Sequence, residues 1–276
     1  MIPLRRREFL KVSGLLLAGA LISNLAPKQL SAGIERSTAS STMDNQSPSV
    51  LWRGNPNLPQ AALTFDDCYD YELLLKLETI LDGYAHVRVT FFPVGLALLN
   101  TATKDAGIWK RLLEKGHAIG CHSYNHDQPS LLSVNEAQAD YELWLGALEQ
   151  AVGYTPTTRL YRPPFGELSY SFLNVCEKNG LIAAMWSTNW GVGPEKLQKE
   201  MPLAQNGEIA LLHIRWQDIE NVSAAIAFLE KRQLQVVTLE EMVDMAAQPL
   251  PTPTATPRSW PPARRPRQHR FKDLET

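Results

Sequence analysis

The chain contains 276 residues, of which 44% are hydrophobic and 20% are charged, and its formal net charge is −2. This length suffices for one large domain or two small ones, and the composition excludes disorder throughout. Residues 37–248 are net acidic, whereas residues 1–36 and 249–276 are each net basic. An acidic body repels a phosphate backbone, so we expect no nucleic-acid partner.

Residues 1–36 have the order of an export signal. Three arginines, Arg5 to Arg7, precede a mostly apolar run over residues 12–25, and small residues follow. The stretch from Arg6 to Lys11 is similar to a twin-arginine signal, the alternative being an ordinary secretory signal. The apolar run is shorter than the roughly 20 residues of a bilayer span, so no stable transmembrane span is expected. We expect an exported protein of the cell envelope or medium, with the signal either cleaved after Ala32 or kept as an anchor.

Two further segments flank a single folded domain. Residues 37–49 are rich in Ser, Thr and Asn and are predicted to be a linker. Residues 248–276 are rich in Pro and Arg and are predicted to form a disordered, solvated tail, because no core can form there. The arginines of this tail suit an anionic cell-wall polymer or a membrane surface as a partner. The folded domain is expected over residues 50–247.

Within that domain, short apolar runs alternate with longer stretches of helical period, the pattern of strand–helix units around parallel strands. Strands are predicted at seven places, which are residues 61–65, 87–92, 117–121, 159–161, 181–186, 208–212 and 235–237. Helices are predicted over 73–81 and 134–148, the second preceded by a capping box of Ser133 and Glu136. Polar residues at the carboxyl ends of parallel strands converge on one mouth, so the chemistry is expected there.

The first predicted strand ends in Asp66 and Asp67. Successive side chains of a strand alternate between its faces, so the two carboxylates point in different directions. One of them can then bind a cation while the other stays free. The competing interpretation is that the pair caps the helix that begins near Asp70.

The third predicted strand leads into His122 and His126. Their spacing of four residues lets both imidazoles reach one metal ion if the segment makes a helical turn. Together with Asp67 they form a set of two histidines and one carboxylate, which leaves coordination positions open for water and substrate. Such a set suits a catalytic divalent metal, most often zinc, and also accepts cobalt or nickel.

Two more polar segments follow predicted strands. Arg162 begins the segment Arg162-Pro163-Pro164-Phe165-Gly166, and His213 directly follows the strand at 208–212. Taken singly, Arg162 is a routine surface cation and His213 a satisfied core histidine. Their positions at strand ends place both beside the predicted metal site.

In combination, these segments resemble the polysaccharide deacetylases, the NodB-homology or carbohydrate esterase family 4 enzymes. The matching segments, in chain order, are Thr64-Phe65-Asp66-Asp67, Thr90-Phe91-Phe92-Pro93-Val94-Gly95, His122-Ser123-Tyr124-Asn125-His126, Arg162-Pro163-Pro164-Phe165-Gly166 and Leu211-Leu212-His213. The resemblance spans nearly the whole domain. It implies an α/β fold, a distorted (β/α)7 barrel, and metal-dependent removal of N- or O-acetyl groups from an acetylated polysaccharide.

The resemblance also implies a role for each residue at the mouth of the barrel. Asp67, His122 and His126 are the expected metal ligands, and Asp66 is the expected general base. Arg162 is expected to pair with that base and orient it.

Four other residues complete the site that the resemblance implies. The backbone N–H of Phe165, where the family usually has Tyr, is expected to help hold the oxyanion. His213 is the expected general acid, and its unperturbed pKa suits that task. Trp190 and Leu211 are expected to wall the pocket that receives the acetyl methyl group.

Besides Phe165, the sequence departs from the family pattern at three positions. Cys68 stands where the family usually has Gly, so a less permissive residue must make the turn after the aspartates. Asn189, in the substrate pocket, stands where the family commonly has the Asp that tunes the acid histidine, and Ile214 stands where an Asp often follows it. We therefore expect a lowered pKa for His213 and a slower enzyme or a more acidic optimum.

The three cysteines, Cys68, Cys121 and Cys176, are too few and too scattered for a disulfide framework or a four-cysteine zinc site. We predict buried thiols rather than a disulfide between Cys68 and Cys121.

The leading hypothesis is an exported deacetylase that acts on an N-acetylglucosamine polymer such as peptidoglycan or chitin. The alternatives are an O-acetyl esterase of the xylan type and a weakly active, metal-bearing carbohydrate-binding domain. Trp52, Trp109 and Trp216 suit stacking on sugar rings, but core packing is the simpler use of each.

Overall fold

A computed structural model describes residues 49–191 and 193–246. The predicted export signal over 1–36 and tail over 248–276 lie outside the described residues, as does all of the predicted linker over 37–49 except its last residue. Among the described residues, no helix has the length and apolar character needed to cross a membrane.

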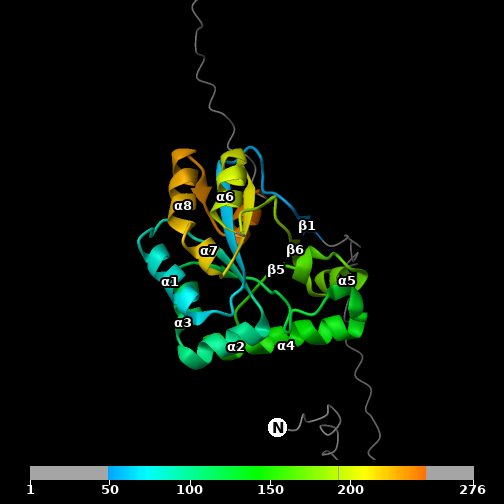
Figure 1. The fold of residues 1–276 in the computed structure, drawn as a ribbon. Helices are drawn as coiled ribbons and strands as arrows, with labels where there is room; N and C mark the ends of the chain where they lie inside the picture. The colour runs from blue at the N-terminus through cyan, green and yellow to red at the C-terminus, as the bar shows by residue number, and fades with distance from the viewer. Residues whose placement is uncertain (1–48, 192, 247–276) are drawn as a thin grey trace, which may run out of the picture. The chain divides into compact units, whose positions relative to one another are not determined.

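The described residues form a parallel α/β fold (Figure 1). The strands are β1 Val50–Leu51, β2 Gln60–Asp67, β3 Thr90–Pro93, β4 Ala118–Ile119, β5 Leu160–Tyr161, β6 Ile182–Ala184, β7 Thr188–Asn189, β8 Glu208–His213 and β9 Gln235–Val236. The α-helices are α1 Tyr71–Asp82, α2 Gly95–Lys104, α3 Ile108–Glu114, α4 Val134–Val152, α5 Tyr170–Asn179, α6 Pro194–Glu200, α7 Trp216–Ile219, α8 Val222–Lys231 and α9 Leu239–Ala246. Short 3-10 helices cover η1 Pro129–Leu131, η2 Pro164–Gly166 and η3 Met201–Leu203.

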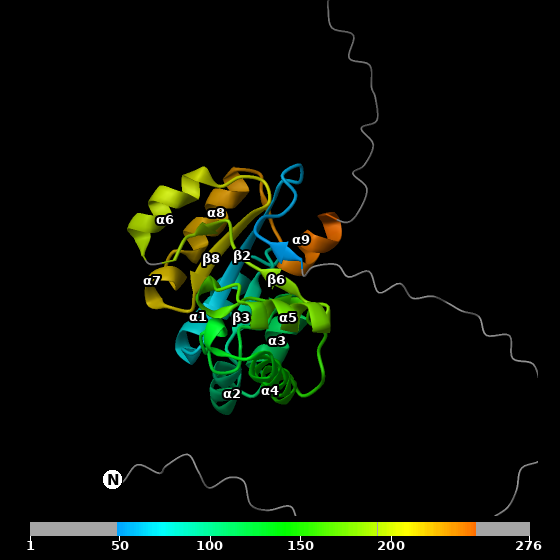
Figure 2. The same cartoon turned by 90° about the vertical axis from the view of Figure 1, so that its right-hand side faces the viewer.

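The strands form two sheets, and every pair of neighbouring strands is parallel. One sheet has the order β4-β3-β2-β8-β7, with β9 also paired to β2, and the other has the order β1-β6-β5. A parallel bridge between Cys121 and Tyr161 joins the sheets on one side. On the other side, the Ser187 N–H donates to the Ile209 carbonyl at 3.0 Å. The strands therefore form an irregular barrel with helices outside it (Figure 2), which confirms the expected fold class.

The alternation of side chains along β2 determines which residues point into the barrel. Leu63 and Phe65 pack outward into the large core beneath the helices. Ala62 belongs to a second cluster that is enclosed by the strands and α9. Because the period of a strand is two, the inner row continues from Ala62 through Thr64 to Asp66. The strand thereby places a carboxylate in the inner row at its carboxyl end.

All seven predicted strands are present, with shifted ends. The strand predicted over 87–92 begins at Thr90, and the one predicted over 181–186 ends at Ala184. β1 and β7 were not predicted, because two residues are too few to show a period.

The two predicted helices are confirmed as α1 and α4. Asp70 caps α1 by accepting the Leu73 N–H at 3.0 Å, and the predicted capping box of Ser133 and Glu136 is present at the start of α4. α4 packs against α2 and α5 (Figure 1) and thereby supports the loop that follows β4.

Candidate active site

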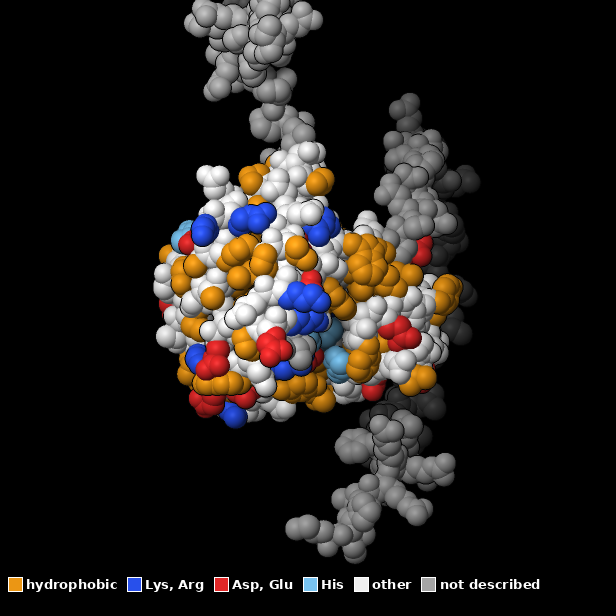
Figure 3. Space-filling view, turned by 45° about the horizontal axis from the view of Figure 1, so that its top comes forward, with side chains coloured by type: hydrophobic (Ala, Val, Ile, Leu, Met, Phe, Trp, Pro, Cys, Tyr) orange, Lys and Arg blue, Asp and Glu red, His pale blue; other side chains and the backbone are white. Residues whose placement is uncertain are grey.

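The carboxyl ends of the parallel strands bring the predicted site residues together. Asp66 and Asp67 end β2, and His213, which ends β8, lies in register with Asp66. His122 and Arg162 follow β4 and β5. A cavity of about 300 Å³ opens among these strand ends, lined by Asp66, Asp67, His122, His126, Pro163, Phe165, Gly166, Trp186, Asn189, Leu211 and His213. In the space-filling view, histidine atoms reach the surface between charged and hydrophobic side chains (Figure 3).

The backbone turns sharply at the end of β2. Asp67 and Cys68 both adopt left-handed conformations, with φ of 68° and 65°, which each cost a residue with a Cβ about 1–2 kcal/mol. The expectation that Cys68 must make this turn in place of glycine is confirmed. The turn separates the environments of the two carboxylates, since the Asp66 side chain is 4% exposed and the Asp67 side chain 35%.

Asp66 is paired with the buried Arg162. The Arg162 Nη1 group donates to Asp66 Oδ1 at 2.7 Å and to Thr64 Oγ1 at 2.8 Å. Its other nitrogens donate to the carbonyls of Ala184 and Met185 at 3.0 and 2.9 Å. These bonds satisfy a guanidinium that is fully removed from water. One oxygen of Asp66 is thereby fixed, and Oδ2 is the oxygen on the side of His122, 3.7 Å from its Nε2.

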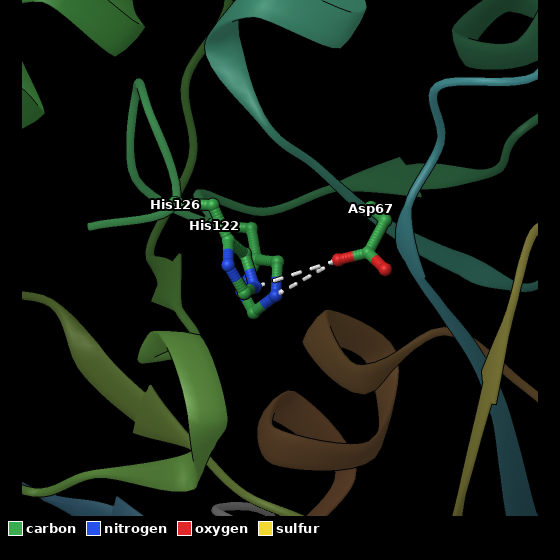
Figure 4. Close-up of side chains that lie close together, drawn as sticks. All are labelled: Asp67, His122 and His126. Atoms are coloured by element: carbon green, nitrogen blue, oxygen red, sulfur yellow. Dashed lines mark ion pairs between the residues drawn. The ribbon is translucent and has the colours of Figure 1, made fainter. Parts of the chain in front are cut away.

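Asp67, His122 and His126 form a compact cluster of metal-ligating atoms (Figure 4). Asp67 Oδ1 lies 3.6 Å from His122 Nε2 and 3.5 Å from His126 Nε2. In a tetrahedral zinc site with bonds of about 2.1 Å, two ligand atoms are about 3.4 Å apart. The donor types and their spacing therefore fit a zinc-like ion with three protein ligands.

The orientation of His122 suits metal binding. Its Nδ1–H donates to the Arg162 carbonyl at 2.9 Å, so the lone pair of Nε2 is free to face Asp67. Burial lowers the pKa of His122 from its ordinary value, against the opposing effect of Asp66 and Asp67. Burial thus favours the neutral imidazole that a metal requires.

The segment from His122 to His126 is a loop, and the helical turn considered for it is not present. Ser123 and His126 have φ of 67° and 63°, outside helical geometry. The His126 N–H donates to Ser123 Oγ at 2.9 Å, which closes the loop and brings the second imidazole back beside the first. Their ring centroids are 5.0 Å apart.

Asp140 of α4 anchors this loop, and the sequence interpretation missed it. Its Oδ2 accepts the Tyr124 N–H at 2.9 Å, and its Oδ1 lies 3.5 Å from Ser123 Oγ. The carboxylate is almost fully buried, and burial raises its pKa. A signal existed in the sequence, because Asp140 falls on the apolar face of α4 between Ala137 and Tyr141.

Phe165 lies beside the metal-ligating cluster. Its backbone is left-handed, with φ of 60°, and Gly166 follows with φ of 69°. The ring is 69% exposed and stands edge-on to His126 with centroids 4.6 Å apart. The residue lines the cavity, and the oxyanion role of its N–H stays a prediction.

The wall of the cavity differs from expectation at one residue. Leu211 and Asn189 line it as expected, whereas Trp190 is buried and is absent from the lining. Trp186 lines the cavity instead and packs against Gly166, where an added Cβ would lie 2.6 Å from its ring. Position 190 is the first residue after β7, and its side chain packs in the outer core.

His213 also lines the cavity, with its side chain 17% exposed. Its pKa is lowered, first by burial and then by Arg215, while Asp66, Asp67 and Asp218 oppose the shift. The expected direction is therefore correct, but burial is its main cause. The oxygen of Asn189 accepts the Gly191 N–H at 3.0 Å.

All three cysteines are free and buried, which confirms the prediction of thiols. Burial raises the pKa of Cys68 and Cys121 and raises that of Cys176 to about 12. Of the tryptophans considered for sugar stacking, Trp109 is in the core, while Trp52 and Trp216 are half-exposed.

These features define a parallel α/β barrel with a candidate metal centre at its mouth. Residues 53–184 match the family model of the polysaccharide deacetylases. The chain belongs to this family of hydrolases, carbohydrate esterase family 4. The matched region contains the two aspartates, both candidate ligand histidines and Arg162, and it ends before His213.

Three similar proteins illustrate the relationship. Peptidoglycan-N-acetylglucosamine deacetylase PgdA of Listeria monocytogenes is 30% identical over 206 residues, which are 68% of this chain and 41% of PgdA. The structure of the Bc1960 peptidoglycan N-acetylglucosamine deacetylase is 27% identical, with a TM-score of 0.62 over 71% of this chain and 92% of that one. A mutant of BA3943, described as a CE4 family pseudoenzyme with restored enzymatic activity, is 25% identical, with a TM-score of 0.64 over 72% of each chain.

The chain spans only part of some relatives. It covers 41% of PgdA and 63% of a second bacterial relative, from Bacillus subtilis. The family includes both active deacetylases and a pseudoenzyme.

Proposed function

We propose that this protein is an exported, metal-dependent deacetylase that hydrolyses the N-acetyl groups of N-acetylglucosamine units in peptidoglycan or a chitin-like polysaccharide. The observation that carries the proposal is the arrangement within one cavity. A cluster of three metal-ligating groups, a carboxylate fixed by a buried arginine and the histidine at the end of β8 line the same space. The substrate class is supported by the names of PgdA and Bc1960.

A divalent metal held by Asp67, His122 and His126 would polarise the acetyl carbonyl and acidify a water molecule. Asp66 would serve as the general base, because Arg162 holds its Oδ1 and leaves Oδ2 on the side of His122. The Arg162 pairing also keeps Asp66 in one orientation.

His213, which lies beside Asp66 on the neighbouring strand β8, protonates the leaving amine in the proposed reaction. The Phe165 N–H helps hold the charge that develops on the carbonyl oxygen. Leu211 and Trp186 supply the apolar surface that receives the acetyl methyl group and excludes water.

The test is acetate release from chitin oligosaccharides, peptidoglycan and acetylated xylan by the full chain, stripped of metal and reloaded with zinc, cobalt or nickel. We expect zinc to restore release from one of the first two substrates. Release from acetylated xylan alone would favour the O-acetyl esterase. No release despite stoichiometric zinc binding would favour the weakly active carbohydrate-binding domain.

Export is proposed from the sequence of residues 1–36 alone. The test replaces Arg6 and Arg7 by Lys and follows the protein by cell fractionation. Accumulation of the variant in the cytoplasm is expected for the twin-arginine route. Undiminished export would assign an ordinary secretory signal.

A further inference from the structure

A buried carboxylate on α7 faces the candidate acid histidine. Asp218 lies five residues after His213, and its side chain is fully buried. Its Oδ2 accepts the His213 backbone N–H at 2.8 Å and lies 3.8 Å from His213 Nδ1. Nδ1 is itself buried and has no hydrogen-bond partner among the described residues. The exposed part of the ring is therefore the Nε2 side, and Nδ1 is turned toward Asp218.

A glycine keeps this space open. An added Cβ at Gly191 would lie 2.8 Å from Asp218 Oδ2, 3.3 Å from Asn189 Oδ1 and 3.4 Å from His213 Nδ1. The three polar atoms thus border one small volume beside the backbone of residue 191. A side chain at that position would force them apart.

We propose that Asp218 is the positioning residue for His213, holding its ring and stabilising its protonated form in the role that an aspartate at position 189 would otherwise take. The inference rests on the proposed function, since it concerns the proposed acid of that reaction. Asp218 acts through His213 and does not contact the substrate.

The charges around His213 favour this assignment. Asp66 and Asp67 at the end of β2 and Asp218 on α7 stabilise an imidazolium, while Arg215 opposes it. Within the described residues, the only carboxylate oxygen within 4 Å of a His213 ring nitrogen is that of Asp218. An opposite charge this close to a buried imidazole favours its protonated form.

A neutral side chain at position 189 is consistent with a charged Asp218 beside His213. Asn189 Oδ1 and Asp218 Oδ2 border the same small volume, so two carboxylates there would repel each other. The amide instead accepts the Gly191 N–H. The local negative charge that the sequence comparison found missing at positions 189 and 214 is supplied from α7.

The experiment is an NMR titration of His213 in the zinc-loaded full chain. The His213 signal is assigned as the one that is missing from the spectrum of His213→Asn. Asp218→Asn retains an oxygen for the His213 N–H and removes the charge. We expect the pKa of His213 to fall by about 1 unit, and the alkaline limb of kcat/KM to move by the same amount. Adding Asn189→Asp to this variant should reverse most of the fall in the pKa of His213. Asp70→Asn, which alters an aspartate that caps α1, should leave the titration unchanged.

A second measurement needs no variant at Asp218. The proposal places the proton of neutral His213 on Nδ1, facing the carboxylate, and leaves Nε2 for the substrate; ¹⁵N shifts report this tautomer. An Nε2–H tautomer, or a pKa that does not move in Asp218→Asn, would overturn the inference. A wild-type chain that releases no acetate would overturn the proposed function, while the NMR titration still decides the role of Asp218.

Discussion

Asp66 and Asp67 are neighbours in the chain with different tasks, because the backbone turns between them. Asp66 continues the inner row of β2 and meets Arg162, whereas Asp67 turns back toward the two histidines. Both residues were assigned these partners from the sequence. Their separation depends on left-handed backbone at Asp67 and Cys68, a feature that an apolar strand pattern does not encode.

Asp66→Asn tests the division of tasks at the end of β2. The variant removes the proposed base and keeps the metal-ligating cluster. We expect kcat to fall by about 10²–10⁴-fold, while zinc still binds with a stoichiometry of one. Acetate release and zinc titration of the same sample measure the two effects. Asp70→Asn serves as the matched control, and activity of Asp66→Asn within a few-fold of wild type would assign the base elsewhere.

His117 makes stability dependent on pH. It is buried beneath β3 with its Nδ1 accepting the Val89 N–H at 3.2 Å, and burial lowers its pKa to about 4. The unfolded chain, with a pKa near 6.5, binds the proton first on acidification. Between pH 6.5 and 4 the unfolding free energy therefore rises with pH, and the stabilisation, about 3 kcal/mol, is complete above pH 6.5.

Urea unfolding across this pH range measures the effect. His117→Asn keeps an acceptor for the Val89 N–H and cannot titrate. The unfolding free energy of this variant should therefore rise less steeply with pH between pH 4 and 6.5 than that of wild type. His86→Asn, at an exposed histidine, should retain it. Equal slopes in wild type and His117→Asn would contradict the prediction.

At the scale of elements, α4 holds the loop that carries two of the three candidate ligands. Asp140 accepts backbone N–H groups of that loop from the buried face of the helix. Groups that orient metal ligands typically contribute 10–100-fold to metal affinity. We expect Asp140→Asn to weaken zinc binding by about this factor, measured by competition with a chelating dye.

Glu142→Gln is the matched control for Asp140→Asn, since Glu142 lies on the exposed face of the same helix and bonds only Gln138 among the contacts described. Its zinc affinity should equal that of wild type. Unchanged affinity in Asp140→Asn would show that the loop holds its shape without α4.

The strand pattern predicted the order of the elements well, because seven buried strands of Val, Leu, Ile, Ala and Phe carry a clear apolar signal. It did not predict β1, β7 or the loop conformation at Ser123 and His126, which depend on tertiary hydrogen bonds. Asp140 and Asp218 were missed for the same reason. A carboxylate within a helix is assigned to a site only when the fold shows what it faces.

At the scale of the whole molecule, the candidate site is assembled from strand ends far apart in sequence. Parallel pairing of β2 with β3 and β8 brings Asp67 beside the loop after β4 and His213 beside Asp66. The alternation of side chains along β2 explains the inward position of Asp66. Trp186 lines the cavity, whereas Trp190 packs in the outer core. The three side chains predicted as metal ligands lie together, whereas one predicted residue of the cavity wall, Trp190, does not line the cavity.

Metal binding should stabilise the whole fold, because the three ligands tie the end of β2 to the loop after β4. Free zinc at about 100 times its dissociation constant contributes about 2.7 kcal/mol to the folded state. For a domain of about 200 residues, this raises Tm by about 5–10 °C. Calorimetry of the full chain with zinc and after chelation measures the difference.

His126→Ala should lose most of this zinc-dependent rise in Tm, since only Asp67 and His122 remain to hold the ion. His86→Ala removes an exposed histidine outside the cluster and should keep the full rise. If the wild-type Tm is the same with and without zinc, the cluster does not bind the ion in the folded protein. If Tm still rises with zinc in His126→Ala, the ion is bound by other residues, because zinc stabilises the folded state only by binding to its ligand side chains.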